Sequence, residues 1–255
     1  MDSPVRVTHV RINSKYRTSG STSSFTCTYN CPELRQCTSI ALLNFTMTRS
    51  YFNVQSFNNS LIFNLNGTRT EKIVPPGEYD AVTLVQVLNT FFQNTVYFEI
   101  VTNNGYDRLK VSLFQQSVFP TTFSFDPASS TMAPVLGLGW FLLNQSSPTY
   151  TSSLPFSLDG PGLYVQLIQG PCDTSTCESS ANPNTNFIPL LAKVCSAYEC
   201  SFGDHIVYEP HNPTVIQFDS PRCLQTISVQ LTDIYGNLHE LPDTCCDFLL
   251  RVTYV

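Results

Sequence analysis

Ten cysteines are the residues of this 255-residue chain with the widest choice of chemistry. Cys172 and Cys177 are separated by four residues, and so are Cys195 and Cys200. Thiolates from two such pairs would bind zinc as a tetrahedron, although zinc knuckles often use a spacing of two residues. Disulfides are the competing interpretation, and their pairing does not follow from a sequence. We expect a few loop disulfides rather than a metal site at these four positions.

Catalytic chemistry finds little support among the other residues. The chain has four histidines and lacks a nucleophile elbow, a zinc-protease motif and a phosphate-binding glycine loop. His205 and His211, with Asp204 and Glu209 beside them, have the groups that ligate metals, but their spacing matches no strong template. Exposed loop positions explain these four residues better. We therefore expect neither an enzyme nor a bound cofactor.

A small basic group near the N-terminus is the candidate binding element. Its basic residues are Arg6, Arg11, Lys15 and Arg17, and Tyr16 lies among them. An alternating run over residues 5–12 and a polar stretch over 13–21 carry these side chains. We interpret residues 1–22 as an arm, or a strand with a loop, that reaches a neighbouring protein. A frayed terminus is the alternative.

Composition limits the possible functions further. The net charge is −6, with 13 basic residues, so the chain lacks the broad basic face that a nucleic-acid reader needs. It has no apolar run of membrane-spanning length, and its first residues lack the apolar segment of a signal peptide. Charged residues make up 13% and aromatic residues 12%. A surface this poor in charge suits a subunit whose apolar patches are covered by neighbours.

Short β-strands must position these residues. Alternating or β-prone runs recur between turn signals, and they lie at 24–29, 38–48, 61–65, 70–74, 96–101, 109–114, 163–168, 205–208, 214–218, 226–231 and 248–254. Asn66-Gly67 predicts a hairpin turn, and apolar spacing after Asp80 predicts one helix over 81–93. The pattern indicates an all-β single jelly roll, an eight-stranded antiparallel sandwich with extra strands and one short inserted helix. We expect one domain over 23–255 with a cysteine-bearing loop insertion near 170–200.

Four short sequence segments, spread over nearly the whole chain, resemble segments of a known protein family and occur in the same order. They are the polar opening at 12–20, Pro-Gly-Glu-Tyr-Asp at 76–80 before the helix, Val-Leu-Gly at 135–137, and Asp-Ile-Tyr-Gly at 233–236 followed by Asp-Phe-Leu-Leu at 247–250. The family comprises the single jelly-roll penton and minor capsid proteins of large eukaryotic DNA viruses, virophages and polinton-like viruses. The cysteines and the loop at 170–200 depart from its pattern.

The resemblance implies a structural protein of the virion, assembled in the cytoplasm of the host cell. A penton of this family forms homopentamers at the fivefold vertices of an icosahedral capsid, beside the major capsid protein and other minor capsid proteins. The arm would then lie on the interior side against these neighbours. One alternative is a minor capsid protein that cements major capsid trimers from inside. Another is a secreted β-sandwich binding or attachment module, which the aromatic content and the Asn-X-Ser/Thr triplets at 44, 58, 66 and 144 favour.

Overall fold

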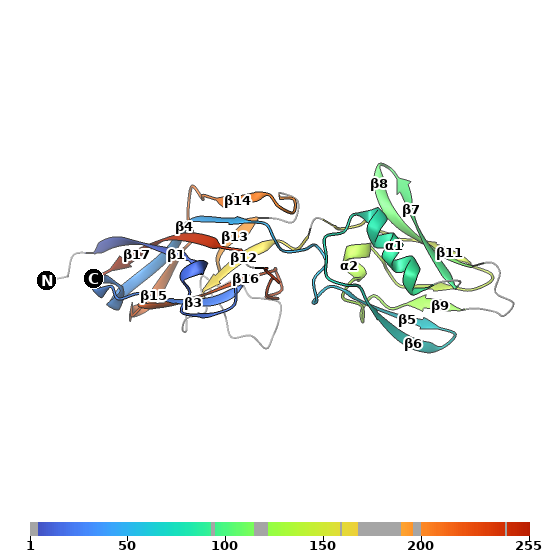
Figure 1. Cartoon of the computed structure of the whole chain (residues 1–255), viewed down its shortest axis with the longest axis horizontal. Coiled ribbons are helices and arrows are strands. Elements are labelled where there is room, and N and C mark those ends of the chain that lie inside the picture. Colours follow the sequence, from blue (N-terminus) through green and yellow to red (C-terminus); the bar gives the residue numbers. More distant parts are fainter. Residues whose placement is uncertain are drawn as a thin grey trace. The chain divides into compact units, whose positions relative to one another are not determined.

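Two separate hydrophobic cores form in the computed structural model, which describes residues 5–92, 95–114, 122–158, 160–167, 190–195, 200–242 and 244–255. They correspond to two compact units of the chain (Figure 1). Unit 1 comprises Met1–Tyr51 and Pro161–Val255, and unit 2 comprises Phe52–Gly160. This differs from the single domain that we expected over 23–255. The physical reason is that the extra strands and the helix bury their apolar side chains in a core of their own.

Unit 1 is built from two antiparallel sheets. The first sheet has the order β1-β17-β4, and both β14 and β15 pair with β4 on the side away from β17. Its strands are β1 (Arg6–Asn13), β4 (Cys37–Thr48), β14 (His205–Tyr208), β15 (Val215–Arg222) and β17 (Cys246–Tyr254). The second sheet has the order β13-β12-β16-β3-β2. Its strands are β2 (Ser19–Gly20), β3 (Ser24–Thr28), β12 (Leu163–Leu167), β13 (Leu190–Cys195) and β16 (Thr226–Thr232).

The strand pairs of unit 1 nest inside one another along the chain. β1 pairs with β17, β3 with β16, β4 with β14 and β15, and β12 with β13. Apart from the two-residue β2, which pairs with β3, the strands therefore pair from the two ends of the chain inward: the first with the last, the next with the one before the last, and so on. A long antiparallel ribbon that is rolled into two sheets gives this order, which defines a jelly roll. The predicted all-β jelly roll is thus confirmed for unit 1.

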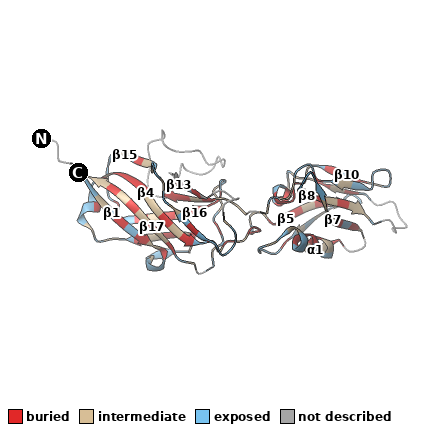
Figure 2. Ribbon diagram, turned by 90° about the horizontal axis from the view of Figure 1, so that it is seen from above, coloured by how far each residue is buried: buried red, intermediate tan, exposed pale blue. Residues whose placement is uncertain are grey.

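Period-two burial explains why these strands form a sandwich. Along β17 the buried side chains are those at 246, 248, 250 and 252, and the residues between them are only half-buried (Figure 2). Phe248 packs against Phe45, with ring centroids 4.8 Å apart, and against Phe25 of the other sheet, with centroids 6.0 Å apart. Alternation places every second side chain on one face of a strand, so one face of each sheet fills the core.

The described part of the predicted arm is not a free segment. Residues 6–13 form β1, which pairs with β17 over its full length from Arg6↔Tyr254 to Asn13↔Asp247. Val10 and Ile12 are buried, so the alternating run seals one side of the core. The Asn13 side chain then accepts a hydrogen bond from the Lys15 N–H and begins the short 3₁₀ turn η1 (Ser14–Tyr16). Of the two forms that we considered, the structure has the strand with a loop.

Unit 2 is inserted between β4 and β12 and also contains two sheets. One has the order β10-β9-β5-β6 and the other the order β11-β8-β7. The strands are β5 (Ser60–Leu65), β6 (Thr68–Ile73), β7 (Val96–Asn103), β8 (Tyr106–Leu113), β9 (Phe123–Phe125), β10 (Phe141–Leu143) and β11 (Thr149–Thr151). The helices are α1 (Ala81–Phe91) and α2 (Ala133–Leu136). Among the described residues, no helix is long and apolar enough to span a membrane.

Local sequence signals explain the turns and the helix of unit 2. Asn66 and Gly67 both have positive φ, at 50° and 82°, as the predicted hairpin turn between β5 and β6 requires. Asp80 caps α1 by accepting a hydrogen bond from the Thr83 N–H at 2.7 Å, and the Thr83 hydroxyl lies 3.1 Å from the Asp80 N–H as its acceptor. The helix that the sequence predicted is therefore confirmed at its start.

Candidate functional site

Arg11 is the member of the basic group that the structure ties most firmly into the fold. It projects from β1 and forms an ion pair with Asp247 of β17, with Nη2 and Oδ2 2.5 Å apart and Nε 3.0 Å from Oδ1. The hydrogen bonds from Arg11, and then its charge, lower the pKa of the Asp247 carboxyl. Asn13 also points its side-chain amide at Asp247, at 3.5 Å. The pair therefore fixes the outer face of β1 against β17.

A hollow of about 480 Å³ lies beside this ion pair. We name it the β1 hollow, and its lining consists of Arg11, Asn13, Tyr16, Cys27, Thr28, Tyr29 and Asp247. The Tyr29 hydroxyl donates a hydrogen bond to the Arg11 carbonyl at 3.1 Å. Burial, and then the neighbouring Cys27, raise the pKa of Tyr29, so this phenol stays a neutral donor. The lining therefore combines a guanidinium paired with a carboxylate, two phenol rings and an amide, and Tyr16 is exposed.

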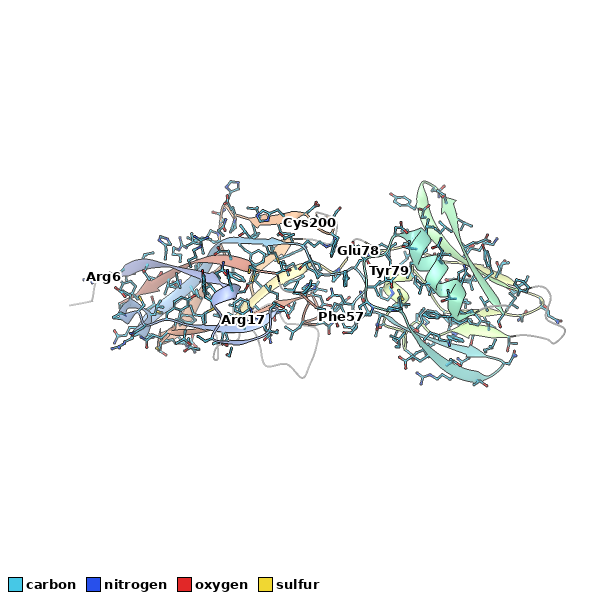
Figure 3. The ribbon with its side chains drawn as sticks, in the orientation of Figure 1. Arg6, Arg17, Phe57, Glu78, Tyr79 and Cys200 are labelled. Atoms are coloured by element: carbon cyan, nitrogen blue, oxygen red, sulfur yellow. The ribbon has the colours of Figure 1, made fainter. Side chains whose placement is uncertain are left out.

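The structure separates the other basic side chains from the β1 hollow. Arg6, at the opposite end of β1, borders a second hollow of about 360 Å³ with Glu33, Arg35 and the C-terminal residues Tyr254 and Val255. Figure 3 shows Arg6 and Arg17 in different parts of unit 1.

Arg17 and Lys15 also lie outside the lining of the β1 hollow. Arg17 donates from Nη1 to the Ser14 carbonyl at 3.0 Å, and Lys15 is exposed on η1. Of the five predicted residues, Arg11 and Tyr16 therefore share a site. The interaction role that we assigned to the group remains a prediction.

The four predicted cysteines fall largely outside the described residues. Cys172 and Cys177 are not described, and Cys195 is described only as backbone at the end of β13. Cys200 is half-buried and packs against the core of unit 1. Within the described ranges, no group of three or more His, Cys, Asp or Glu side chains is arranged to hold a metal. The choice between disulfides and zinc at these positions therefore stays a prediction.

Sequence reasoning missed a second cysteine group. Cys31 precedes the 3₁₀ turn η2 (Pro32–Arg35), Cys37 begins β4, and Cys223 follows β15. Burial, and then the nearby Cys223 and Cys31, raise the pKa of Cys37 to about 11. All three carry free thiols. The register of β15 on β4 places Arg222 opposite Cys37 and so brings Cys223 close to it, and sequence spacing gives no sign of this.

The acidic side chains within residues 204–211 make hydrogen bonds that hold the turn before β14 and the end of that strand. The Asp204 carboxylate accepts a hydrogen bond from the Ser201 N–H at 2.7 Å and so closes the turn before β14. Glu209, just after β14, accepts a hydrogen bond from the Asn44 side chain at 2.8 Å. His205 and His211 are exposed. All four residues are exposed, as we expected, although His205 lies in strand β14 rather than in a loop.

No family model and no curated protein sequence matches the chain. A crystal structure of the mavirus penton protein is similar with a TM-score of 0.48 and 10% identity, and it covers 99% of this chain and 100% of that one. A chain in the cryo-EM structure of the Sputnik virophage is similar with a TM-score of 0.46 and 13% identity, and the coverage is 98% of both chains.

Proposed function

We propose that this chain is a structural capsid protein, a penton that forms homopentamers at the fivefold vertices of an icosahedral capsid. The observation that carries the proposal is the nested strand order of unit 1. Double-sheet jelly rolls of this kind build viral capsid subunits and lectin domains. The ordered sequence segments that resemble penton and minor capsid proteins favour the capsid over the lectin. The role that we infer is structural, without an enzymatic step or a cofactor.

The surface chemistry of both units supports a subunit inside an assembly. Large apolar side chains are exposed on several elements of each unit. In unit 1 they include Val5, Val7, Tyr16, Val207, Ile234 and Tyr235, and in unit 2 they include Val82, Tyr97, Tyr106, Trp140, Leu142 and Leu154. Charged residues make up only 13% of the chain, so there are few charged groups to keep the apolar side chains of different molecules apart in solution. Exposed apolar surface of this kind is a mark of partner sites.

A fivefold ring also requires two different contact surfaces on each subunit, and the unlike sheet edges of unit 1 are consistent with this. Ring closure requires heterologous contacts, in which one face of a subunit binds a different face of the next. The two edges of the first sheet, β1 on one side and β14 with β15 on the other, differ in length and in side chains. The partners that we propose are further copies of this chain, the major capsid protein and other minor capsid proteins. The proposed location is the virion, with assembly in the cytoplasm of the host cell.

Native mass spectrometry of the purified full chain tests the proposal. We expect a species of five times the 28.5 kDa chain mass that persists on dilution to low micromolar concentration. A protein that stays monomeric at all concentrations would contradict the penton. It would instead favour the cementing protein or the binding module. A closed oligomer with another number of subunits would retain the capsid role but refute the vertex position.

A further inference from the structure

One edge of the first sheet of unit 1 carries positive charge. On the outer face of β1, His9 and Arg11 alternate with the buried Val10 and Ile12, and Arg251 of β17 lies opposite His9. Arg6 is exposed at the start of β1. We call the side chains of Arg6, His9, Arg11 and Arg251 the basic edge. Asp247, the partner of Arg11, is the single acidic residue among β1 and β17.

The opposite edge of the same sheet carries negative charge. β14 and β15 both pair with β4 on the side away from β17, so together they form this edge. Asp204 directly precedes β14, Glu209 directly follows it, and Asp219 lies within β15. All three are exposed. We call these three side chains the acidic edge; β15 also carries the cation Arg222, whose guanidinium lies over the Phe218 ring at 5.5 Å.

The need to keep open edge strands from pairing with other sheets does not by itself explain why the two edges carry opposite charges. Charges on edge strands keep the unpaired N–H and C=O groups from joining other sheets, and one sign of charge at both edges would serve that purpose. Because the two edges carry opposite charges, a contact between two basic edges or between two acidic edges is disfavoured. The same charges favour the contact of unlike edges, which is how complementary charge sets partner and register.

Each edge also offers an apolar side chain next to its charges. Val7 of β1 is 54% exposed and precedes His9 on the same outer face. Val207 of β14 is 55% exposed and lies two residues before Glu209. An edge contact would bury both side chains and the open backbone groups beside them. Charge would select the contact, and this burial would stabilise it.

We propose that the acidic edge of one copy of this chain docks against the basic edge of the next copy. The contact is heterologous, because it joins two different surfaces, so repeated contacts close into a ring when the rotation between copies allows it. The inference rests on the proposed function in one respect, since it names the surfaces through which the homo-oligomer forms.

A charge swap tests the proposal. The basic-edge variant carries Arg6→Glu and Arg251→Glu, the acidic-edge variant carries Glu209→Lys and Asp219→Lys, and the swap variant carries all four. Arg11 is left intact because its ion pair with Asp247 belongs to the fold of the monomer. Sedimentation velocity over a concentration series gives the dissociation constant between subunits. Far-UV circular dichroism confirms that each variant is folded.

Each single-edge variant should raise the dissociation constant by about tenfold or more, because attraction becomes repulsion at the contact. The swap variant should return it to within about threefold of the original protein, since opposite charges again face each other. Salt should weaken the original oligomer, as charge screening requires. The matched control is Arg69→Glu with Lys72→Glu on β6, which changes the net charge as much as the basic-edge variant does and should leave the constant unchanged.

The results test the edge contact and the penton proposal independently of each other. If the protein is an oligomer that the edge variants do not weaken, or if the swap variant is weaker than either single-edge variant, the edge contact is refuted and the penton proposal stands. If the edges behave as proposed but the ring holds a number of subunits other than five, the vertex position fails and the edge contact stands. A monomer at every concentration refutes both.

Discussion

His239 is a buried histidine of unit 1, and its surroundings predict a loss of stability in mild acid. Its ring lies against Tyr51, with centroids 4.3 Å apart, and its Nε2 is 3.1 Å from the Gly162 carbonyl oxygen. Burial lowers the pKa of His239 from 6.5 to about 4. Arg49 adds to this shift, whereas Gly162 and Asp233 partly oppose it. The native protein therefore holds this imidazole neutral.

The sign and the size of the effect follow from proton linkage. Between pH 6.5 and 4 the unfolded chain binds the His239 proton and the native protein does not, so acid favours unfolding. The stabilisation is complete above pH 6.5 and decreases as the pH falls through this window. One pKa unit corresponds to about 1.4 kcal/mol, so unit 1 should lose ~2 kcal/mol by pH 5 and ~3 kcal/mol by pH 4. This is a large part of the roughly 5–15 kcal/mol of stability that is typical of a domain.

Hydrogen exchange at increasing denaturant, at pH 7.5 and pH 5.0, measures this loss in β4 and β17. Unit 2 is the internal control, because Phe52–Gly160 contains no histidine and holds the one tryptophan, Trp140, as its own fluorescent reporter. His239→Gln should be less stable at pH 7.5 but should lack the histidine-dependent decrease towards pH 5.0. Equal stability of unit 1 at both pH values would show that the native protein does not hold His239 neutral. The same pH slope in His239→Gln would show that the slope does not arise from His239.

The remaining predictions concern two glycines, a helix cap and a pair of cysteines. Gly137→Ala should destabilise unit 2 by ~3 kcal/mol, because its φ is 64° and a Cβ would lie 2.3 Å from a backbone carbonyl oxygen. Gly67→Ala, with positive φ but open space, should cost only ~1 kcal/mol, and similar losses of tryptophan-monitored stability in both variants would contradict this account. Asp80→Ala should cost unit 2 ~1 kcal/mol through the lost helix cap, and no change in its denaturation midpoint would refute that role. An alkylating reagent should label the exposed Cys245 of the native protein well before Cys246, whose pKa burial raises to about 12, and equal rates would be inconsistent with the structure.

Local structure could be predicted from the sequence where short-range chemistry determines it. The β-prone run at 248–254 predicted a strand that lies within β17, and Asn66-Gly67 predicted the turn after β5. Asp80 gave the start of α1, which ends at Phe91, two residues before the predicted end. In each case the signal lies within a few residues of the element that it determines.

The division into two units could not be predicted in this way. Strand patterns look alike in both units, and the choice of partner depends on contacts between distant parts of the chain. β1 pairs with β17, whose residues lie about 240 positions away, and the whole of unit 2 is inserted between β4 and β12. Period and turn signals predict that a strand exists but not which strand lies beside it.

The candidate site was predictable as a group of residue types but not as an arrangement. The basic residues near the N-terminus were evident, yet Asp247, which pairs with Arg11, lies 236 residues away. Asp204 and Glu209 attracted notice only as metal ligands, because their charge gains its meaning from the position of β14 in the sheet. The opposite charges of the two edges become visible only after the strand order is known.

Cryo-EM reconstruction of particles that contain this chain would show where it sits in the capsid. We expect five copies around each fivefold vertex, with the jelly roll of unit 1 fitting the density of each copy. Density for the chain beneath the major capsid trimers, with none at the vertices, would contradict the penton and identify a cementing protein. Absence of the chain from the particle would contradict the capsid role altogether.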